Sequence, residues 1–128
     1  MSPKVGVAVL VFHEGKILLG KRLASHGENL FAPPGGHLEF GETPIECAKR
    51  ELFEETALTA LSFEEGPWIS TFFENKHYVT LFIKVYAFEG ELSLKEPTKC
   101  ESWNWFEKEK LPRPFFYPFE HFLEKYQL

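Results

Sequence analysis

Three closely spaced glutamates would share one face of a helix. At about 100° per residue, Glu51, Glu54 and Glu55 project into an arc of roughly 100°. Glu51 and Glu55 form an i,i+4 pair of like charges, which destabilises even an exposed helix. No Lys or Arg lies three or four residues from either of them. A bound divalent cation would offset this repulsion, and a solvated acidic face is the alternative interpretation.

The residues around the glutamates favour the metal interpretation. Arg50 lies at i−4 from Glu54 and at i+4 from Glu46, so it is placed to brace both carboxylates. Upstream, Gly35-Gly36 and Gly41 let the backbone turn tightly and approach a ligand, and a carbonyl there can join an oxygen shell. Because the cluster contains no His or Cys, oxygen ligation predicts Mg²⁺, with Mn²⁺ able to substitute, over zinc.

A capped helix must position these glutamates. Thr43 is a suitable N-cap, Pro44 suits the first helical position, and Glu46 completes a Thr-x-x-Glu capping box. The helix should extend to about Thr56. The apolar residues expected on its buried face are Ile45, Ala48 and Leu52.

The rest of the chain alternates strand patterns with turns. Val5–Phe12 is almost entirely apolar and predicts a strand buried on both faces, with Ile17–Arg22 as its hairpin partner. The glycine- and proline-rich segment 31–36 is predicted to be irregular. The further elements expected are strands Trp68–Phe73, His77–Phe88, with a turn at Asn75-Lys76 between them, and Trp103–Phe106, and a helix Phe119–Tyr126. This pattern predicts an α/β or α+β sandwich.

Composition restricts the function classes. The length of 128 residues predicts a single domain. The net charge of −5 argues against a surface for long nucleic acid. No apolar run reaches membrane-spanning length and no signal peptide is recognisable, so we expect no membrane partner and a cytoplasmic location. Cys47 and Cys100 are expected to be reduced and partly buried.

Residues 36–58 resemble the Nudix box, Gly-x5-Glu-x7-Arg-Glu-U-x-Glu-Glu-x-Gly-U, in which U is a bulky aliphatic residue. Every fixed position matches except Ala57, which stands where the family usually has Gly. A left-handed conformation there would cost Ala roughly 1 kcal/mol relative to Gly. The flanking segments Val5–Arg22, His77–Thr80 and Lys99–Trp105 resemble the MutT-like nucleoside triphosphate diphosphatases, above all the animal branch that acts on oxidised and thio-substituted guanine nucleotides.

The resemblance implies a fold, an activity and roles for the acidic residues. It implies one Nudix hydrolase domain over residues 1–128, an α/β/α sandwich with a mixed central sheet and two main helices, and a homodimer. The activity would be magnesium-dependent cleavage of a nucleoside triphosphate to the monophosphate and pyrophosphate. Glu51, Glu54 and Glu55 would hold Mg²⁺ with the Gly36 carbonyl, Glu51 or Glu54 would also take the proton from water, and Arg50 would orient them.

Other residues are weaker candidates. Glu101 is either an additional acid, as in some relatives, or a surface residue. The candidates for substrate binding are Lys21, Arg22, His37, His77, Phe116 and Tyr117. The two basic residues end a strand and either meet phosphate or are solvated. His37 follows the glycines, whereas His77 is equally compatible with capping a strand. The two aromatic residues would surround a nucleobase, with core packing as the alternative for Phe116.

The same box is compatible with other functions. The substrate could be ADP-ribose or another nucleoside diphosphate derivative, or dihydroneopterin triphosphate. A non-catalytic nucleotide-binding module is a further hypothesis. The intact Arg50-Glu51 and Glu54-Glu55 argue against it, because a module without chemistry would be free to lose them.

Overall fold

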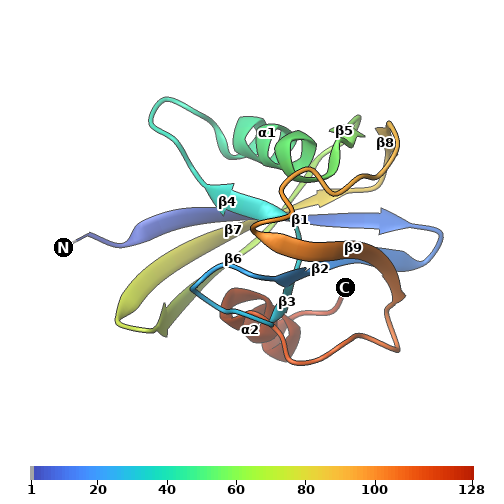
Figure 1. Ribbon diagram of the computed structural model, residues 1–128. Helices are drawn as coiled ribbons and strands as arrows, with labels where there is room; N and C mark the ends of the chain where they lie inside the picture. The colour runs from blue at the N-terminus through green and yellow to red at the C-terminus, as the bar shows by residue number, and fades with distance from the viewer. Residues whose placement is uncertain (1) are drawn as a thin grey trace.

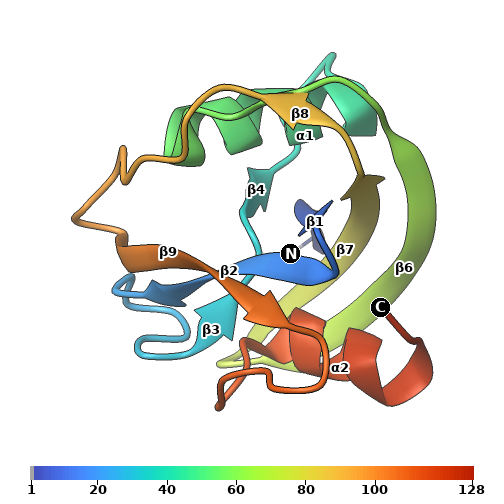
Figure 2. The same ribbon diagram turned by 90° about the vertical axis from the view of Figure 1, so that its right-hand side faces the viewer.

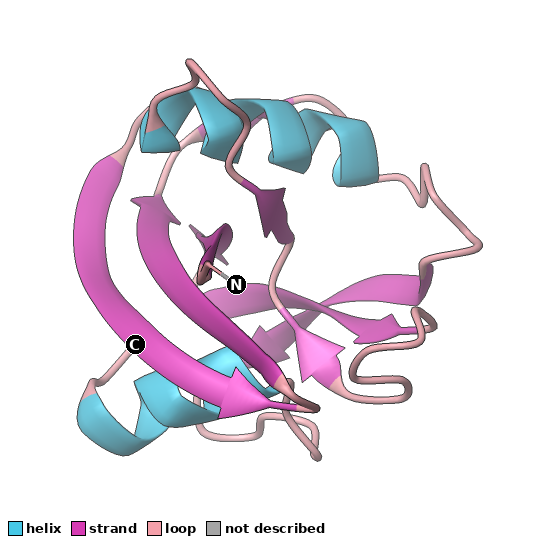
Figure 3. Cartoon of the chain, turned by 90° about the vertical axis from the view of Figure 1, so that its left-hand side faces the viewer, coloured by secondary structure: helices cyan, strands magenta, loops and turns pink. Residues whose placement is uncertain are grey.

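A computed structural model describes residues 2–128 as strands lying between two helices. Helices α1 (Pro44–Thr56) and α2 (Tyr117–Lys125) lie on opposite sides of the strands (Figures 1 and 3). The strands are β1 (Lys4–His13), β2 (Lys16–Arg22), β3 (Phe31–Ala32), β4 (Gly35–His37), β5 (Thr59–Ala60), β6 (Glu64–Phe73), β7 (Lys76–Val85), β8 (Phe88–Glu89) and β9 (Cys100–Glu107). The expected α/β/α sandwich is confirmed.

Strand β1 is the centre of a mixed sheet. Its residues Lys4–Val11 pair in parallel with Tyr78–Val85 of β7. Its other edge is shared, since β4 pairs antiparallel with its first half and β2 continues from its end as a hairpin. The sheet order is β3-β2-β1-β7-β6, and β9 adds to β2. Long β6 forms the curved outer edge of this arrangement (Figure 2).

Alternate residues of β1 enter two different hydrophobic clusters, which explains why this strand is apolar on both faces. Val7, Val9 and Val11 pack in a cluster with residues of α1. Leu10 and Phe12 belong to the cluster that contains residues of α2. The two helices therefore cover opposite faces of the strand that the sheet is built around.

Both ends of α1 follow local rules. The Glu46 amide donates to Thr43 Oγ1 at 3.1 Å and the Thr43 amide donates to Glu46 Oε1 at 2.8 Å, which confirms the capping box. The helix ends at Thr56, and Ala57 adopts φ 67°, in the left-handed region. The buried face differs from the prediction: Ile45 is 38% exposed, whereas Cys47 is buried. Periodicity gives the direction of a side chain but not what lies opposite it.

Several element boundaries also differ from the predictions. Residues 31–36 contain β3 and β4; glycine is needed there because a Cβ on Gly35 would lie 2.2 Å from the Val7 carbonyl oxygen. The predicted long strand divides, since β7 ends at Val85 and Phe88 pairs with Ala60 in a separate ladder. The preceding turn is at Glu74-Asn75, and α2 begins earlier than expected, at Tyr117.

Cys47 and Cys100 are both free, and both are buried, where only partial burial was predicted. Among residues 2–128, no helix combines the length and the apolar character needed to cross a bilayer.

Candidate active site

A cavity of about 440 Å³ joins segments that are far apart in the sequence. Glu51 and Glu55 line it from α1, whereas Phe116, directly before α2, lines it with Phe73 and Tyr78. The two helices lie on opposite sides of the sheet (Figure 1). The glutamates of α1 and the aromatic residues beside α2 therefore give the cavity an acidic end and an aromatic end. Such a cavity suits a planar ring at its aromatic end and, once a cation neutralises the carboxylates, a phosphate chain at its acidic end.

The two glutamates at the acidic end are held against the glycines of β4. A Cβ on Gly36 would lie 2.4 Å from the Glu51 carboxyl carbon, so only glycine leaves room for this carboxylate. Glu55 Oε2 accepts a hydrogen bond from the Gly35 amide at 2.9 Å. Burial raises the pKa of Glu51, and it raises the pKa of Glu55 to about 8. The negative charge of this pair is therefore poorly solvated.

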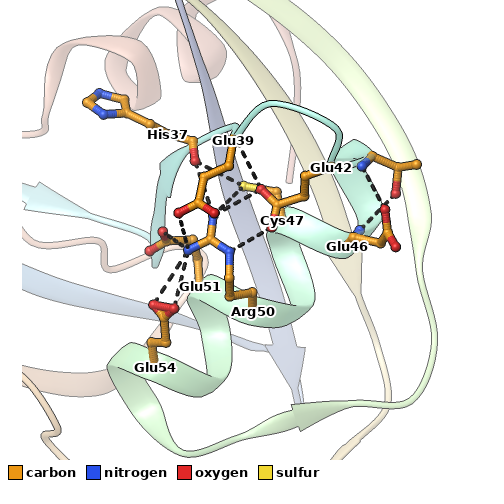
Figure 4. A network of polar contacts seen from close by, with 9 residues as sticks. His37, Glu39, Glu42, Glu46, Cys47, Arg50, Glu51 and Glu54 are labelled. Atoms are coloured by element: carbon orange, nitrogen blue, oxygen red, sulfur yellow. Dashed lines mark hydrogen bonds and ion pairs between the residues drawn. The ribbon is translucent and has the colours of Figure 1, made fainter.

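Arg50 is the centre of a network of carboxylates (Figure 4). Its Nε donates to Glu42 Oε2 at 2.6 Å, and its Nη1 donates to Glu51 at 2.7 Å and to Glu54 at 3.3 Å. The hydrogen bond from Arg50 lowers the pKa of Glu42 to about 2. The predicted contact of Arg50 with Glu54 is present, but Glu42 takes the place expected for Glu46, whose carboxylate closes the capping box instead. Glu51 is likewise neutralised by Arg50, a partner that the i,i+3 and i,i+4 positions did not reveal.

These carboxylates fit a hard divalent cation. Glu51 and Glu55 offer oxygen ligands. Burial disfavours their ionised forms, and a bound cation would remove that penalty. Glu54 lies on the same helix and is partly exposed. Within the described residues no three His, Cys, Asp or Glu side chains are already gathered as a ligand set. In this structure the carboxylates of Glu51 and Glu54 are directed to Arg50.

Glu96, and not Glu101, lines the cavity. Along β9, buried Cys100 lines the cavity, so the side chain of the next residue, Glu101, is directed away and is exposed. Glu96 precedes β9, where the Lys95 amide donates to the Glu55 carbonyl at 3.2 Å and ties this segment to the end of α1. The sequence did not reveal Glu96, because the approach of this residue to the cavity depends on a contact between distant segments.

At the aromatic end, the Arg22 guanidinium lies over the Phe116 ring, 4.0 Å from its centroid. Its Nε donates to the His26 carbonyl at 3.0 Å. Burial lowers the pKa of Arg22. Tyr78 joins this end to the glycines, because its hydroxyl lies 2.8 Å from His37 Nε2. Of the residues predicted to bind substrate, Arg22, His37 and Phe116 line the cavity.

Three other predicted substrate contacts lie elsewhere. Lys21 and His77 are neighbours in sequence of the cavity residues Arg22 and Tyr78, so strand alternation directs their side chains to the opposite face. The Nε2 atom of His77 accordingly lies 2.9 Å from Ser70 Oγ. The Tyr117 ring packs on Phe73, with ring centroids 4.8 Å apart, and is not part of the cavity lining.

Phe73 and Tyr78 are cavity residues that the sequence predictions missed. The period of two in β7 contained the signal, since Tyr78, Thr80 and Phe82 alternate and all three line the cavity. No comparable local pattern marks Phe73, because it reaches the cavity from the end of β6.

Comparisons with known proteins place this geometry among related molecules. The family model described as NUDIX domain matches residues 2–126. The chain is similar to the solved MutT NUDIX hydrolase from Burkholderia pseudomallei, with 26% identity, 98% of each chain covered and a TM-score of 0.92. It is 30% identical to RNA pyrophosphohydrolase of Bartonella clarridgeiae, covering 83% of this chain and 77% of that protein. A 47% identical match to phosphatase NudJ of Escherichia coli strain K12 covers 46% of this chain and 38% of NudJ.

Proposed function

The chain belongs to the NUDIX family and is a Nudix hydrolase acting on pyrophosphate bonds, and we propose that it hydrolyses a nucleoside triphosphate to the monophosphate and pyrophosphate with Mg²⁺. We also propose that residues 1–128 form one Nudix domain. The observation that carries the proposal is the pair of half-buried carboxylates, Glu51 and Glu55, packed against Gly35-Gly36 at one end of a cavity whose other end is aromatic.

The proposed site separates metal binding from positioning. Glu51, Glu54 and Glu55, with the Gly36 carbonyl, would hold the cation, and Glu96 is better placed than Glu101 to add a carboxylate. The bound cation would neutralise phosphate charge and ease removal of a proton from water. Arg50 donates to both Glu51 and Glu54 and so restricts their orientation. Arg50 is therefore a positioning residue.

Proton removal falls to a carboxylate of the same helix. Glu51 or Glu54 takes the proton of the attacking water, and the geometry favours Glu54 as the more mobile group, because it is partly exposed and its bond to Arg50 is longer, 3.3 Å against 2.7 Å for Glu51. The water attacks one phosphorus of the bridge between the α- and β-phosphates, and breaking the P–O bond of that bridge gives the monophosphate and pyrophosphate.

The aromatic end would receive the base. Phe116 has one ring face covered by Arg22, so the base meets the Arg22–Phe116 pair together with Phe73 and Tyr78. The flanking resemblance supports an oxidised or thio-substituted guanine nucleotide as the substrate. The match to the NUDIX domain alone supports a wider set that includes ADP-ribose and dihydroneopterin triphosphate.

A product-resolved screen tests the proposal. Common and oxidised nucleoside triphosphates, ADP-ribose and dihydroneopterin triphosphate are incubated with and without Mg²⁺, and monophosphate and pyrophosphate are quantified. We expect magnesium-dependent pyrophosphate release from a triphosphate. Glu54→Gln should lower kcat by about 10²–10⁴-fold. Glu124→Gln, an exposed glutamate on α2, is the matched control and should leave turnover unchanged.

Two outcomes contradict the proposal. Full magnesium-dependent turnover in Glu54→Gln would remove the assigned role of this carboxylate. Nucleotide binding without turnover of any substrate, with or without Mg²⁺, would instead identify a non-catalytic nucleotide-binding module.

A further inference from the structure

The loop between β2 and β3 forms a compact unit at the aromatic end of the cavity. Its two ends are joined, because the Arg22 amide donates to the Leu30 carbonyl at 2.9 Å and the Asn29 amide donates to the Arg22 carbonyl at 2.8 Å. Inside it, the Leu30 amide donates to the Gly27 carbonyl at 3.1 Å. The loop contributes Ala24 and His26 to the cavity lining, next to Arg22 at the end of β2. Its conformation therefore shapes the place where the base would lie.

Two contacts hold the loop over the cavity. The Leu23 amide donates to the Lys99 carbonyl at 2.9 Å, which joins the loop to the segment before β9. Gly27, with φ +68°, is seated on the Phe116 ring so closely that a Cβ would lie 2.5 Å from a ring carbon. These contacts fix one side and the tip of the loop.

His26 closes the remaining side against the turn between β6 and β7, which lies beside the loop (Figures 2 and 3). Its Nε2 contacts Lys76 Nζ, and its Nδ1 lies 3.7 Å from Glu74 Oε1. Because a lysine ammonium can only donate, Nε2 is the acceptor in the contact with Lys76, and Glu74 lies on the other side of the imidazole ring. Glu74 and Asn75 both have positive φ, as in the tight two-residue hairpin turn, so the partner is itself a constrained element.

We propose that this Lys76–His26–Glu74 contact, called here the His26 clasp, is a specificity-determining closure that restricts the substrate to nucleotides without bulky substituents on the base. The inference rests on the proposed function, because the proposed function places the base of the nucleotide at the aromatic end of the cavity. A larger base must displace the loop, and the clasp opposes that displacement. The His26 carbonyl also holds the Arg22 guanidinium, so loss of the clasp loosens the wall that the base meets.

The binding test compares matched pairs of nucleotides that share one triphosphate chain: ATP with N6-benzyl-ATP and GTP with N2-benzyl-GTP. Affinities are measured by calorimetry, and kcat and KM by pyrophosphate release. In the unaltered protein the benzyl nucleotide should bind more weakly than its parent. His26→Ala and Lys76→Met should each lower the ratio of the benzyl nucleotide's dissociation constant to that of its parent by about tenfold. The change should appear in KM and not in kcat. The double variant should lower the ratio no further, since both substitutions break one contact.

Control variants and a second readout separate the clasp from general loss of structure. His13→Ala and Lys110→Met remove side chains that are 50% and 80% exposed and should leave the ratio unchanged. Amide hydrogen exchange of the nucleotide-free protein should become faster in residues 23–30 and 74–76 in both clasp variants. Exchange does not depend on hydrolysis, so it tests the clasp even if the proposed activity fails. An unchanged nucleotide ratio in both clasp variants overturns the inference, whatever the exchange shows.

Discussion

At the residue scale, the acidic site is organised by contacts that Arg50 makes in several directions. One guanidinium bonds Glu42 in the loop before α1 and Glu51 and Glu54 on the helix itself. It also donates to the His37 carbonyl at 3.2 Å. A planar group with five donors in a fixed geometry can join these acceptors, whereas a lysine could not. The loop, the helix and β4 are thereby held in one arrangement.

Glu42 should make stability depend on pH. Its pKa is lowered to about 2 in the folded protein, from an ordinary value of 4.5, by the bond from Arg50. A lowered carboxyl pKa contributes stability that is fully present above pH 4.5 and is lost as the pH falls from 4.5 towards 2. Glu42→Gln should therefore lower the urea midpoint at pH 7, and the difference from the unaltered protein should shrink through that window.

Urea unfolding between pH 7 and the acid end of that window measures the effect. Glu109→Gln, at an exposed glutamate, should leave the midpoint nearly unchanged throughout. A Glu42→Gln difference that stays constant with pH would show that the Arg50 contact does not depend on the charge of Glu42.

At the element scale, α1 presents its ligands because its two ends are locally defined. The capping box fixes the start at Thr43, and Thr56 bonds back to the Leu52 carbonyl at 2.6 Å at the other end. Between them, Ala48 and Leu52 are buried while Glu51 and Glu55 project to the cavity. The register of the helix thus sets which residues face the core and which face the ligand.

Ala57 has a strained backbone conformation at the end of this helix, and a glycine there would remove the strain. Its φ of 67° is a conformation that glycine adopts freely and alanine does not. Ala57→Gly should raise the free energy of unfolding by about 1 kcal/mol, measured by urea denaturation. Lys49→Gly, at an exposed position inside the same helix, should lower it by about 1 kcal/mol. Equal effects of the two substitutions would contradict this account, since it requires opposite signs.

At the scale of the whole molecule, the cavity exists because two cores hold α1 and α2 on opposite faces of one sheet. Phe122 of α2 is fully buried and packs on Phe82 of β7, with ring centroids 4.7 Å apart. Phe82 and the neighbouring helix residue Phe119 also line the cavity. The aromatic end of the site is therefore continuous with the core beneath α2.

Removal of the Phe122 ring should weaken both stability and the site. Phe122→Ala should lower the free energy of unfolding by about 3–5 kcal/mol, because a buried ring leaves a void. It should also weaken nucleotide affinity, as α2 loses its anchor. Phe72→Ala is the control, since that ring is 75% exposed, and it should change stability little. Urea unfolding and calorimetric titration measure the two effects; a loss in Phe72→Ala as large as that in Phe122→Ala would contradict the packing argument.

The sequence by itself determined the features that depend on residues close together in the chain. The capping box, the extent of α1 and the hairpin of β1 and β2 were all predicted correctly. Each arises from hydrogen bonds or side-chain periodicity within a few residues. The shared face of Glu51 and Glu55 belongs to the same class, and it carried the functional prediction.

The tertiary structure alone decided which side chains meet in the cavity. It brought Glu96, and not the candidate Glu101, to the cavity together with Phe73 and Tyr78, and it directed His77 away. It also chose Glu42 over Glu46 as the partner of Arg50. These contacts join segments that only the sheet order brings together, and a shift of one residue along a strand reverses the face of a side chain. Local patterns contain no record of that pairing, so the acidic helix face was visible in the sequence, whereas the meeting of Arg22 and Phe116 with Phe73 and Tyr78 required the fold.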